Sequence, residues 1–248
     1  MKPATIATAV LMLLGTAMAG AADLTVMSSS GMSTMMKQLI PAFERSSGHR
    51  VTISYDTSNI VMGRIKGGEA ADLIILTGPV IDELAKQGKV TAGSRADLAR
   101  SGIGVAVRSG APRPDIGSVE AFRRSLLEAR SVTYTATGAS GIYFAGVTEK
   151  LGIAGAVRAK AKTPPGGHVA ELVARGEAEL GVQMISELRG VPGVEYVGPL
   201  PAELQMFTVF SAGLFTGSRE AAAAQALIRF LSTPDAARVY QAGGMEPS

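Results

Sequence analysis

The sequence contains no cysteine and no tryptophan in 248 residues, and only two histidines. Without cysteine the chain can form neither a disulfide framework nor a thiolate metal site, and it cannot carry a lipid on an N-terminal cysteine. His49 and His168 lie far apart in the sequence, and no H-E-x-x-H motif is present. Phosphate-loop and dinucleotide-binding motifs are also missing. We therefore expect no metal and no cofactor.

Charged and aromatic residues are scarce as well. They make up 18% and 5% of the chain, and the formal net charge is +3. The longest basic cluster is Arg123-Arg124, and no aromatic residues are interleaved with basic ones. Nucleic-acid-binding surfaces need such patches, so we expect no nucleic-acid partner. The apolar content of 46% indicates a globular chain, and the small positive excess favours an anionic small-molecule ligand.

The N-terminus has the order of a secretory signal. Lys2 precedes an apolar stretch at 4–14, and small residues follow around Ala19 and Ala22. The apolar stretch is nearer to about ten residues than to the roughly 20 that span a bilayer, which disfavours a retained membrane anchor. We expect residues 1–22 to be a signal peptide, cleaved after Ala19 or Ala22, and the mature protein to lie in the periplasm.

Strand-like and helix-like segments alternate in two blocks. The segment 72–76, which is continuously apolar after Asp72, is typical of a strand buried on both faces. Between Met32 and Phe43 the apolar residues recur at the spacing of one helix face. This alternation predicts an α/β fold with parallel strands covered by helices. The strand-like stretches 102–107 and 204–215 suit crossings between two lobes.

We therefore predict the two-lobed α/β organisation in which a hinge joins two halves around an inter-lobe cleft. Lobe 1 is expected to comprise residues 23–101 and lobe 2 residues 102–205. Residues 206–248 are expected to return to lobe 1. We expect the protein to be a monomer.

Three loops rich in small hydroxyl residues precede predicted helices. They are Ser28-Ser29-Ser30-Gly31, Thr57-Ser58-Asn59 and Thr137-Gly138-Ala139-Ser140-Gly141. In a parallel α/β sheet such loops lie at the carboxyl ends of strands, where ligands bind. The free N–H groups at helix N-termini favour an oxyanion there. Each loop taken alone could equally be an ordinary helix cap. Three such loops in comparable positions favour one shared anion site.

Several segments, in this order and spacing, carry a resemblance to a known family. They are Leu24-Thr25-Val26 with the serine loop, Ser58, Gly68-Glu69-Ala70-Ala71-Asp72-Leu73-Ile74, Ala139-Ser140-Gly141-Ile142-Tyr143 and Gly176-Glu177-Ala178-Glu179-Leu180-Gly181-Val182. Over about residues 24–244 the chain resembles the periplasmic molybdate-binding proteins of ABC transporters, which have the type II periplasmic binding protein fold. The resemblance implies a protein that closes on a small oxyanion, such as molybdate or tungstate, and presents it to a permease in the inner membrane.

The resemblance also implies the residues that contact the anion. They are Ser29, Ser30, Gly31, Ser58, Asn59, Ser140, Gly166, Gly167 and Met184. Gly31 stands where the family has a first-loop serine, and Met184 stands where it has a binding tyrosine. A hydroxyl donor is therefore missing at position 184, and Gln183 or Ser186 would have to replace it.

The same resemblance extends to a periplasmic aconitate isomerase, which gives an alternative function. The chain would then be a cofactor-free isomerase or a tricarboxylate-binding protein. A tricarboxylate requires a cation in the site, which Arg64 or Lys66 could supply. Isomerisation moves a proton between two carbons and requires a base with a pKa near neutrality, for which His168 is the candidate.

Overall fold

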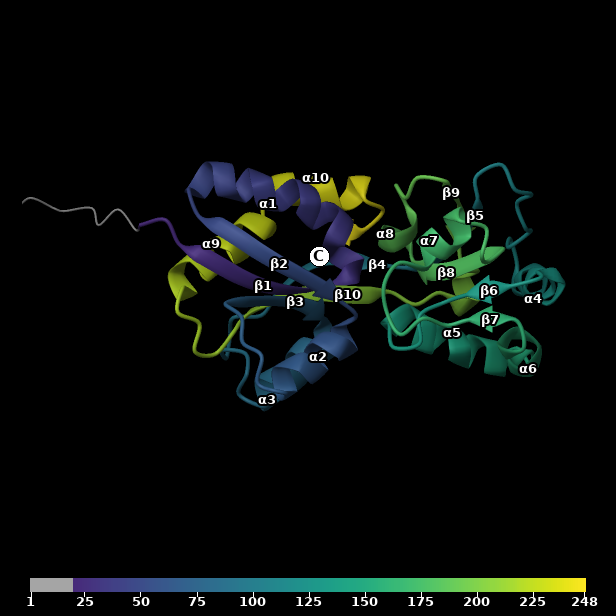
Figure 1. The fold of residues 1–248 in the computed structure, drawn as a ribbon, viewed down its shortest axis with the longest axis horizontal. Helices are drawn as coiled ribbons and strands as arrows, with labels where there is room; N and C mark the ends of the chain where they lie inside the picture. The colour runs from purple at the N-terminus through teal and green to yellow at the C-terminus, as the bar shows by residue number, and fades with distance from the viewer. Residues whose placement is uncertain (1–19) are drawn as a thin grey trace, which may run out of the picture.

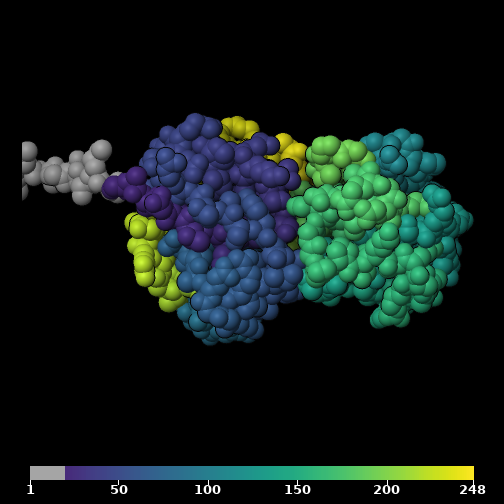
Figure 2. All heavy atoms as spheres, viewed as in Figure 1, coloured from purple at the N-terminus to yellow at the C-terminus, as the bar shows by residue number. Residues whose placement is uncertain are grey.

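The computed structural model describes residues 20–248, so the expected signal peptide lies, apart from residues 20–22, outside the described part of the chain. Two β-sheets, each with its own helices, form two lobes side by side (Figure 1). Figure 2 shows the two bodies in contact along one seam, with both ends of the described chain in one body and its middle in the other. The fold is α/β and two-lobed, as the sequence predicted.

The first lobe contains a six-stranded mixed sheet in the order β11-β4-β10-β3-β1-β2. β1 pairs in parallel with β2 and β3, and β10 runs antiparallel between β3 and β4. Its strands are β1 (Asp23–Ser29), β2 (Arg50–Asp56), β3 (Leu73–Thr77), β4 (Ala96–Ser101), β10 (Thr208–Leu214) and β11 (Glu246–Pro247). Its helical elements are the 3-10 turn η1 (Ser30–Met32), α1 (Ser33–Ser47), α2 (Ser58–Lys66), α3 (Gly78–Lys86), α9 (Ala221–Leu231) and α10 (Pro234–Ala242).

The second lobe contains a five-stranded sheet in the order β7-β6-β8-β5-β9. β6 is parallel to β7 and β8, whereas β5 is antiparallel to β8 and β9. Its strands are β5 (Ile103–Arg108), β6 (Val132–Thr133), β7 (Ala161–Lys162), β8 (Leu180–Met184) and β9 (Val194–Pro199). Its helices are α4 (Val119–Glu128), α5 (Ala139–Lys150), α6 (Ala154–Arg158), α7 (Val169–Ala174) and α8 (Ile185–Leu188), and the 3-10 turn η2 (Ala202–Leu204) follows β9.

The chain crosses between the two sheets at two adjacent places. It leaves the first sheet at Gly102, between β4 and β5, and returns through residues 200–207, between β9 and β10. The Gln205 carboxamide joins the two crossings: its oxygen accepts the Ile103 N–H at 2.8 Å, and its nitrogen donates to the Ile103 carbonyl at 2.9 Å. Two paired crossings of this kind form a hinge about which lobes can rotate.

The methionine-rich segment forms the helix that its spacing predicted, with a difference at the start. Met35, Met36 and Phe43 are buried on one face of α1, but the helix is preceded by the 3-10 turn η1. In that turn Gly31 packs against β10, and a Cβ at Gly31 would lie only 2.5 Å from Cζ of Phe210. Position 31 therefore admits no side chain, because the Phe210 ring occupies the space.

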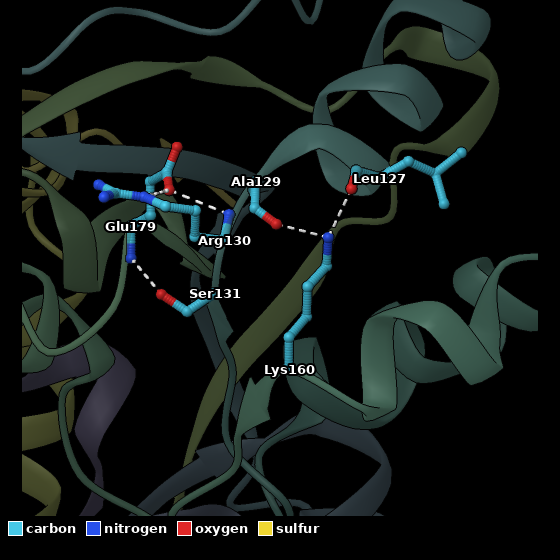
Figure 3. Close-up of polar contacts among 6 residues, drawn as sticks. All are labelled: Leu127, Ala129, Arg130, Ser131, Lys160 and Glu179. Atoms are coloured by element: carbon cyan, nitrogen blue, oxygen red, sulfur yellow. Dashed lines mark hydrogen bonds and ion pairs between the residues drawn. The ribbon is translucent and has the colours of Figure 1, made fainter.

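A polar cluster fixes the outer end of the second lobe (Figure 3). Lys160 Nζ donates to the carbonyls of Leu127, at 2.7 Å, and Ala129. The backbone and side-chain N–H groups of Arg130 each bind the Glu179 carboxylate at 3.0 Å. A cation beside the last carbonyls of a helix is favourable to the helix dipole. These contacts tie the end of α4 to the sheet, far from the seam between the lobes (Figure 1).

The first turn of α5 packs so tightly that Gly141 has no room for a side chain, and substitution of the helix glycines tests this packing. A Cβ at Gly141 would overlap the carbonyl oxygen of Thr135, whereas Gly146 in the same helix faces open space. We expect Gly141→Ala to lower the free energy of unfolding by about 1–3 kcal/mol, as overpacking does. Gly146→Ala should raise it by about 0.5–1 kcal/mol, since alanine favours a helix. Urea denaturation measures both, and equal effects would contradict this packing.

Candidate functional site

Residues of both lobes enclose a small cavity of about 20 Å³ at the seam, here named the inner cavity. It is lined by Ser29, Ser30, Thr57, Ser58, Thr77, Thr135, Gly138, Ala139, Ser140, Gln183, Met184, Glu187 and Phe210. Most of these residues carry hydroxyl groups, and none of the lining residues, all within 20–248, is a lysine, arginine or histidine. The polar groups that face the cavity are therefore neutral donors and a single carboxyl group.

The first lobe places its hydroxyl groups at the N-terminus of α2. The sequence predicted a helix from about Ile60, but α2 begins at Ser58, and Thr57 is the cap whose Oγ1 accepts the Ile60 N–H at 3.4 Å. Ser58 Oγ accepts the Thr77 N–H at 3.0 Å. The hydroxyl hydrogen of Ser58 is thus left to donate to a group in the inner cavity.

The second lobe contributes the N-terminus of α5. Its N-cap residue, Gly138, has no side chain to bind the first N–H groups of the helix. Ser140, in that first turn, is 2% exposed and lines the inner cavity. Uncapped N–H groups and the helix dipole give this end a partial positive charge. The α5 N-terminus therefore favours an oxyanion in the inner cavity without a full positive charge.

Glu187 is the one acidic side chain on the inner cavity. It lies in the short helix α8, directly after β8, and is only 7% exposed. Burial raises the pKa of Glu187 from its usual value of 4.5 to about 8, although a hydrogen bond with the backbone of Met184 opposes this. Glu187 therefore holds its proton at neutral pH but can exchange it, which is the property of a general acid or base.

Hydrogen bonds across the seam hold the lobes in this closed arrangement. Thr137 Oγ1 donates to the Pro165 carbonyl and lies 2.9 Å from Thr57 Oγ1, so the Thr57 hydroxyl is the donor of the inter-lobe bond. Asn59 Nδ2 donates to the Thr137 carbonyl at 2.9 Å. Asn59, one of the expected ligand contacts, thus binds the other lobe and lies outside the inner cavity.

Four more of the expected residues also lie outside the inner cavity. Gly31 packs against Phe210, and Gly166 faces lobe 1, where a Cβ would lie 2.8 Å from Asp56 Oδ1. Gly167 has φ +84 and accepts a hydrogen bond from the Gln183 amide through its carbonyl. His168 is the fourth.

His168 lies at the seam rather than on the inner cavity. Its Nε2 is 3.4 Å from Ser33 Oγ of the other lobe, and its Nδ1 is buried without a partner within residues 20–248. Burial lowers the pKa of His168, and Lys37 lowers it further against the opposing effect of Glu171. His168 is therefore a neutral inter-lobe contact, and the structure does not bring it to the carboxyl and hydroxyl groups of the inner cavity.

The expected cations lie at the opposite end of α2 from the inner cavity. Arg64 and Lys66 are in the last turn of the helix, whereas Ser58 begins it. Six residues of helix separate Ser58 from Arg64, about 9 Å. The Arg64 guanidinium binds Glu69, with Nε 2.7 Å from Oε2. The structure therefore does not bring either cation to the inner cavity.

A wider groove of about 660 Å³ adjoins the inner cavity and shares Ser58, Thr77 and Ala139 with it. Asn59 and Tyr143 are among its lining residues, and so is the half-exposed Phe207. The inner cavity and the groove thus lie next to each other on the same three residues.

Sequence reasoning missed Glu187 and Thr135 altogether. Both line the inner cavity and both are almost fully buried. The signal that could have found Glu187 is an acidic residue three positions after the end of an apolar strand, within 180–188. Gln183 lies on the inner cavity, but its amide binds the Val169 N–H and the Gly167 carbonyl.

Two features are absent from residues 20–248. No three His, Cys, Asp or Glu side chains gather there in a way that could hold a metal ion. No helix in that range combines the length and the apolar character needed to cross a bilayer.

A two-lobed α/β fold with a polar cavity at the seam defines the class of solute-binding proteins. The chain belongs to the bacterial extracellular solute-binding protein family, whose model matches residues 24–246.

Named relatives are similar to nearly the whole chain. An aconitate isomerase from Pseudomonas sp is 37% identical over 230 residues, which cover 90% of this chain and 87% of the relative. The molybdate-binding protein ModA of Azotobacter vinelandii is 27% identical over 236 residues, which cover 91% and 90%. Among solved structures, the periplasmic molybdate-binding protein of Azotobacter vinelandii matches with a TM-score of 0.77 at 21% identity, covering 90% of this chain and 98% of the other.

The raised pKa of Glu187 predicts a pH dependence of stability. Between pH 6.5 and 8 the folded chain holds a proton on Glu187 that the unfolded chain has released, because the folded pKa is about 8 and the usual value is 4.5. The free energy of unfolding should therefore fall as pH rises, by up to about 1.4 kcal/mol per pH unit, and level off above the folded pKa.

Glu187→Gln should remove this slope. Urea denaturation between pH 6.5 and 9 measures it. His168, whose pKa is lowered in the folded chain but is about 6.5 in the unfolded chain, adds the same contribution near pH 6.5–7.5 to both proteins, so the difference between their slopes reports Glu187. A slope that is the same in the variant and the wild type would show that other groups cause it.

Proposed function

We propose that this protein is an aconitate isomerase of the periplasm. The observation that carries the proposal is Glu187, a carboxyl group with a pKa near 8 enclosed with neutral donors in the inner cavity. The similarity to the Pseudomonas aconitate isomerase supports it. At neutral pH most of Glu187 is protonated and can donate a hydrogen bond to an anion, and the minor ionised form can accept a proton from the ligand. A proton-transfer step gives that side chain a use.

The proposed step is a proton shift along three carbons. The Glu187 carboxylate takes a proton from the methylene carbon of the substrate, and the released electron pair forms a new double bond to the central carbon. The electrons of the old double bond then take the proton back at its far end. One C–H bond breaks and one forms, so no electron acceptor or second substrate is required. A pKa near 8 leaves about a tenth of Glu187 ionised at pH 7, and its acid form returns the proton.

Negative charge moves onto the substrate carboxylate during this step. The hydroxyl groups of Ser29 and Ser58 and the N–H groups at the α5 N-terminus, near Ser140, surround the space where that carboxylate would lie. Fixed neutral donors in a dry cavity stabilise developing charge more strongly than water does. Their role in the proposal is to bind the carboxylate and to lower the barrier to proton removal.

In the proposal the two spaces hold different ends of the substrate. The inner cavity, whose volume of about 20 Å³ is little more than one water molecule needs, takes an oxygen of one carboxylate. The remaining carboxylates extend past Ser58 and Ala139 into the groove of about 660 Å³, where the cation among the lining residues is Arg95, ion-paired with Asp82. The carbon that loses its proton is then beside Glu187, and the remainder of the molecule is in a wider space.

A second candidate is capture of a small oxyanion for an ABC permease. The neutral donors of the inner cavity favour this function, since a tetrahedral oxyanion can be bound by hydrogen bonds alone. In that case a permease in the inner membrane is the partner and the chain, as a monomer, delivers the anion to it. The expected signal peptide and the family membership are consistent with both candidate functions and do not distinguish them.

Turnover of cis-aconitate tests the first candidate. We expect NMR to show trans-aconitate accumulating with the wild-type protein, and Glu187→Gln to lower the rate by about 100- to 10,000-fold because the proton acceptor is lost. Binding of cis-aconitate should survive in that variant. Glu128→Gln, which changes an exposed carboxyl at the end of α4, is the matched control and should retain full activity.

A thermal-shift screen separates the two candidates. For a ligand at 100 times its Kd we expect a stabilisation of about 2.7 kcal/mol. Under the first candidate cis-aconitate produces this shift, and molybdate and sulfate do not. A shift with molybdate alone, together with no trans-aconitate by NMR, would reject the isomerase and support the oxyanion carrier.

A further inference from the structure

Thr135 has a buried hydroxyl group that nothing in the described chain binds. The residue lies between β6 and α5 and is 2% exposed. Its Oγ1 has no hydrogen-bond partner within residues 20–248, and Thr135 is one of the residues that line the inner cavity. Buried hydroxyl groups in native proteins are almost always paired, because an unpaired one has lost its hydrogen bonds to water. The Thr135 hydroxyl therefore lacks a hydrogen-bond partner, and a ligand atom in the inner cavity could supply one.

The first turn of α5 holds this hydroxyl group in place. A Cβ at Gly138 would overlap Thr135 Oγ1, and a Cβ at Gly141 would overlap its carbonyl oxygen. Both positions are glycine, so the turn closes directly on Thr135. The hydroxyl group is thereby fixed beside Ser140 and the uncapped N–H groups of the helix. A donor fixed in this way needs no reordering when an anion arrives.

The other candidates for this donor are excluded by their contacts. The sequence resemblance led us to expect Gln183 or Ser186 in place of a hydroxyl at position 184. The Gln183 amide is already bonded on both sides, to Val169 and Gly167. Ser186 Oγ is buried but is not among the groups that line the inner cavity. Among the residues of lobe 2, Thr135 is the fully buried hydroxyl that both lines the inner cavity and lacks a partner.

We propose that Thr135 is a substrate-binding residue, whose hydroxyl donates to the same ligand oxygen that the N-terminus of α5 binds. This assignment rests on the proposed function in one respect, namely that the ligand is an anion held in the inner cavity. Together, the Thr135 hydroxyl and the backbone N–H groups of α5 form a binding site for one carboxylate oxygen, and Ser58 lies opposite in the other lobe.

The test compares four proteins by isothermal titration calorimetry with cis-aconitate, all in the Glu187→Gln background so that no turnover occurs. Thr135→Val removes the hydroxyl and keeps the shape, and we expect it to raise Kd by about 10- to 100-fold, as the loss of a hydrogen bond to a charged group does. Thr135→Ser restores the hydroxyl and should bind within about threefold of the parent protein.

Thr133→Val is the matched control. Thr133 is also fully buried with an unpartnered hydroxyl, but it does not line the inner cavity. We expect its Kd to stay within about twofold of the parent. Without ligand, Thr135→Val should unfold at the parent temperature or above, because the hydroxyl makes no bond in the folded chain. A lower unfolding temperature would show that the hydroxyl serves the fold, and would overturn the assignment.

The outcomes also separate this proposal from the proposed isomerase. An unchanged Kd in Thr135→Val overturns the role of Thr135 even if the wild-type protein isomerises aconitate. A weakened Kd in that variant, with no trans-aconitate formed by the wild type, supports Thr135 and rejects the isomerase. If the parent binds none of cis-aconitate, trans-aconitate, citrate and molybdate, both proposals are wrong.

Discussion

A carboxyl group enclosed without a cation beside it keeps its proton at neutral pH, and the inner cavity depends on that condition. Desolvation of Glu187 brings its pKa to about 8. An arginine or lysine on the cavity wall would bind an anionic ligand more strongly, but it would also hold Glu187 ionised and depress its pKa. Hydroxyl groups and a helix N-terminus attract the anion without this effect. In the proposed function, the neutral donors bind the anion without lowering the pKa of Glu187, so that Glu187 can still gain and lose its proton near neutral pH.

The contact between the two lobes encloses this environment. Ser29, Ser30 and Ser58 come from one lobe and Thr135, Ser140 and Glu187 from the other, so neither lobe alone encloses the cavity. The turn η1 of the first lobe packs directly on α8, which carries Glu187. The burial that raises the pKa of Glu187 thus includes atoms across the seam. In the proposed function, binding, exclusion of water and readiness for proton transfer all require the lobes to be in contact.

The sequence allowed the two-lobed α/β fold to be predicted, because apolar periodicity and glycine punctuation are local signals. It also indicated Ser29, Ser30, Ser58 and Ser140, since hydroxyl residues ahead of helices have a known geometry at the carboxyl ends of strands.

The rest of the site depends on how the lobes meet, which no local pattern records. Asn59 and His168 look like ligand contacts in the sequence, but each binds the opposite lobe. Glu187 and Thr135 lie beside apolar segments, and only the folded chain shows that they line a shared cavity.

The hydrogen bonds at the seam bear on how the lobes separate and meet. When the lobes part, Thr137 can stay bonded to Pro165 and Thr57 can continue to cap α2, since each of these bonds lies within one lobe. The Thr57 and Thr137 side chains are thus already ordered within their own lobes, so forming the contact between them costs little side-chain entropy.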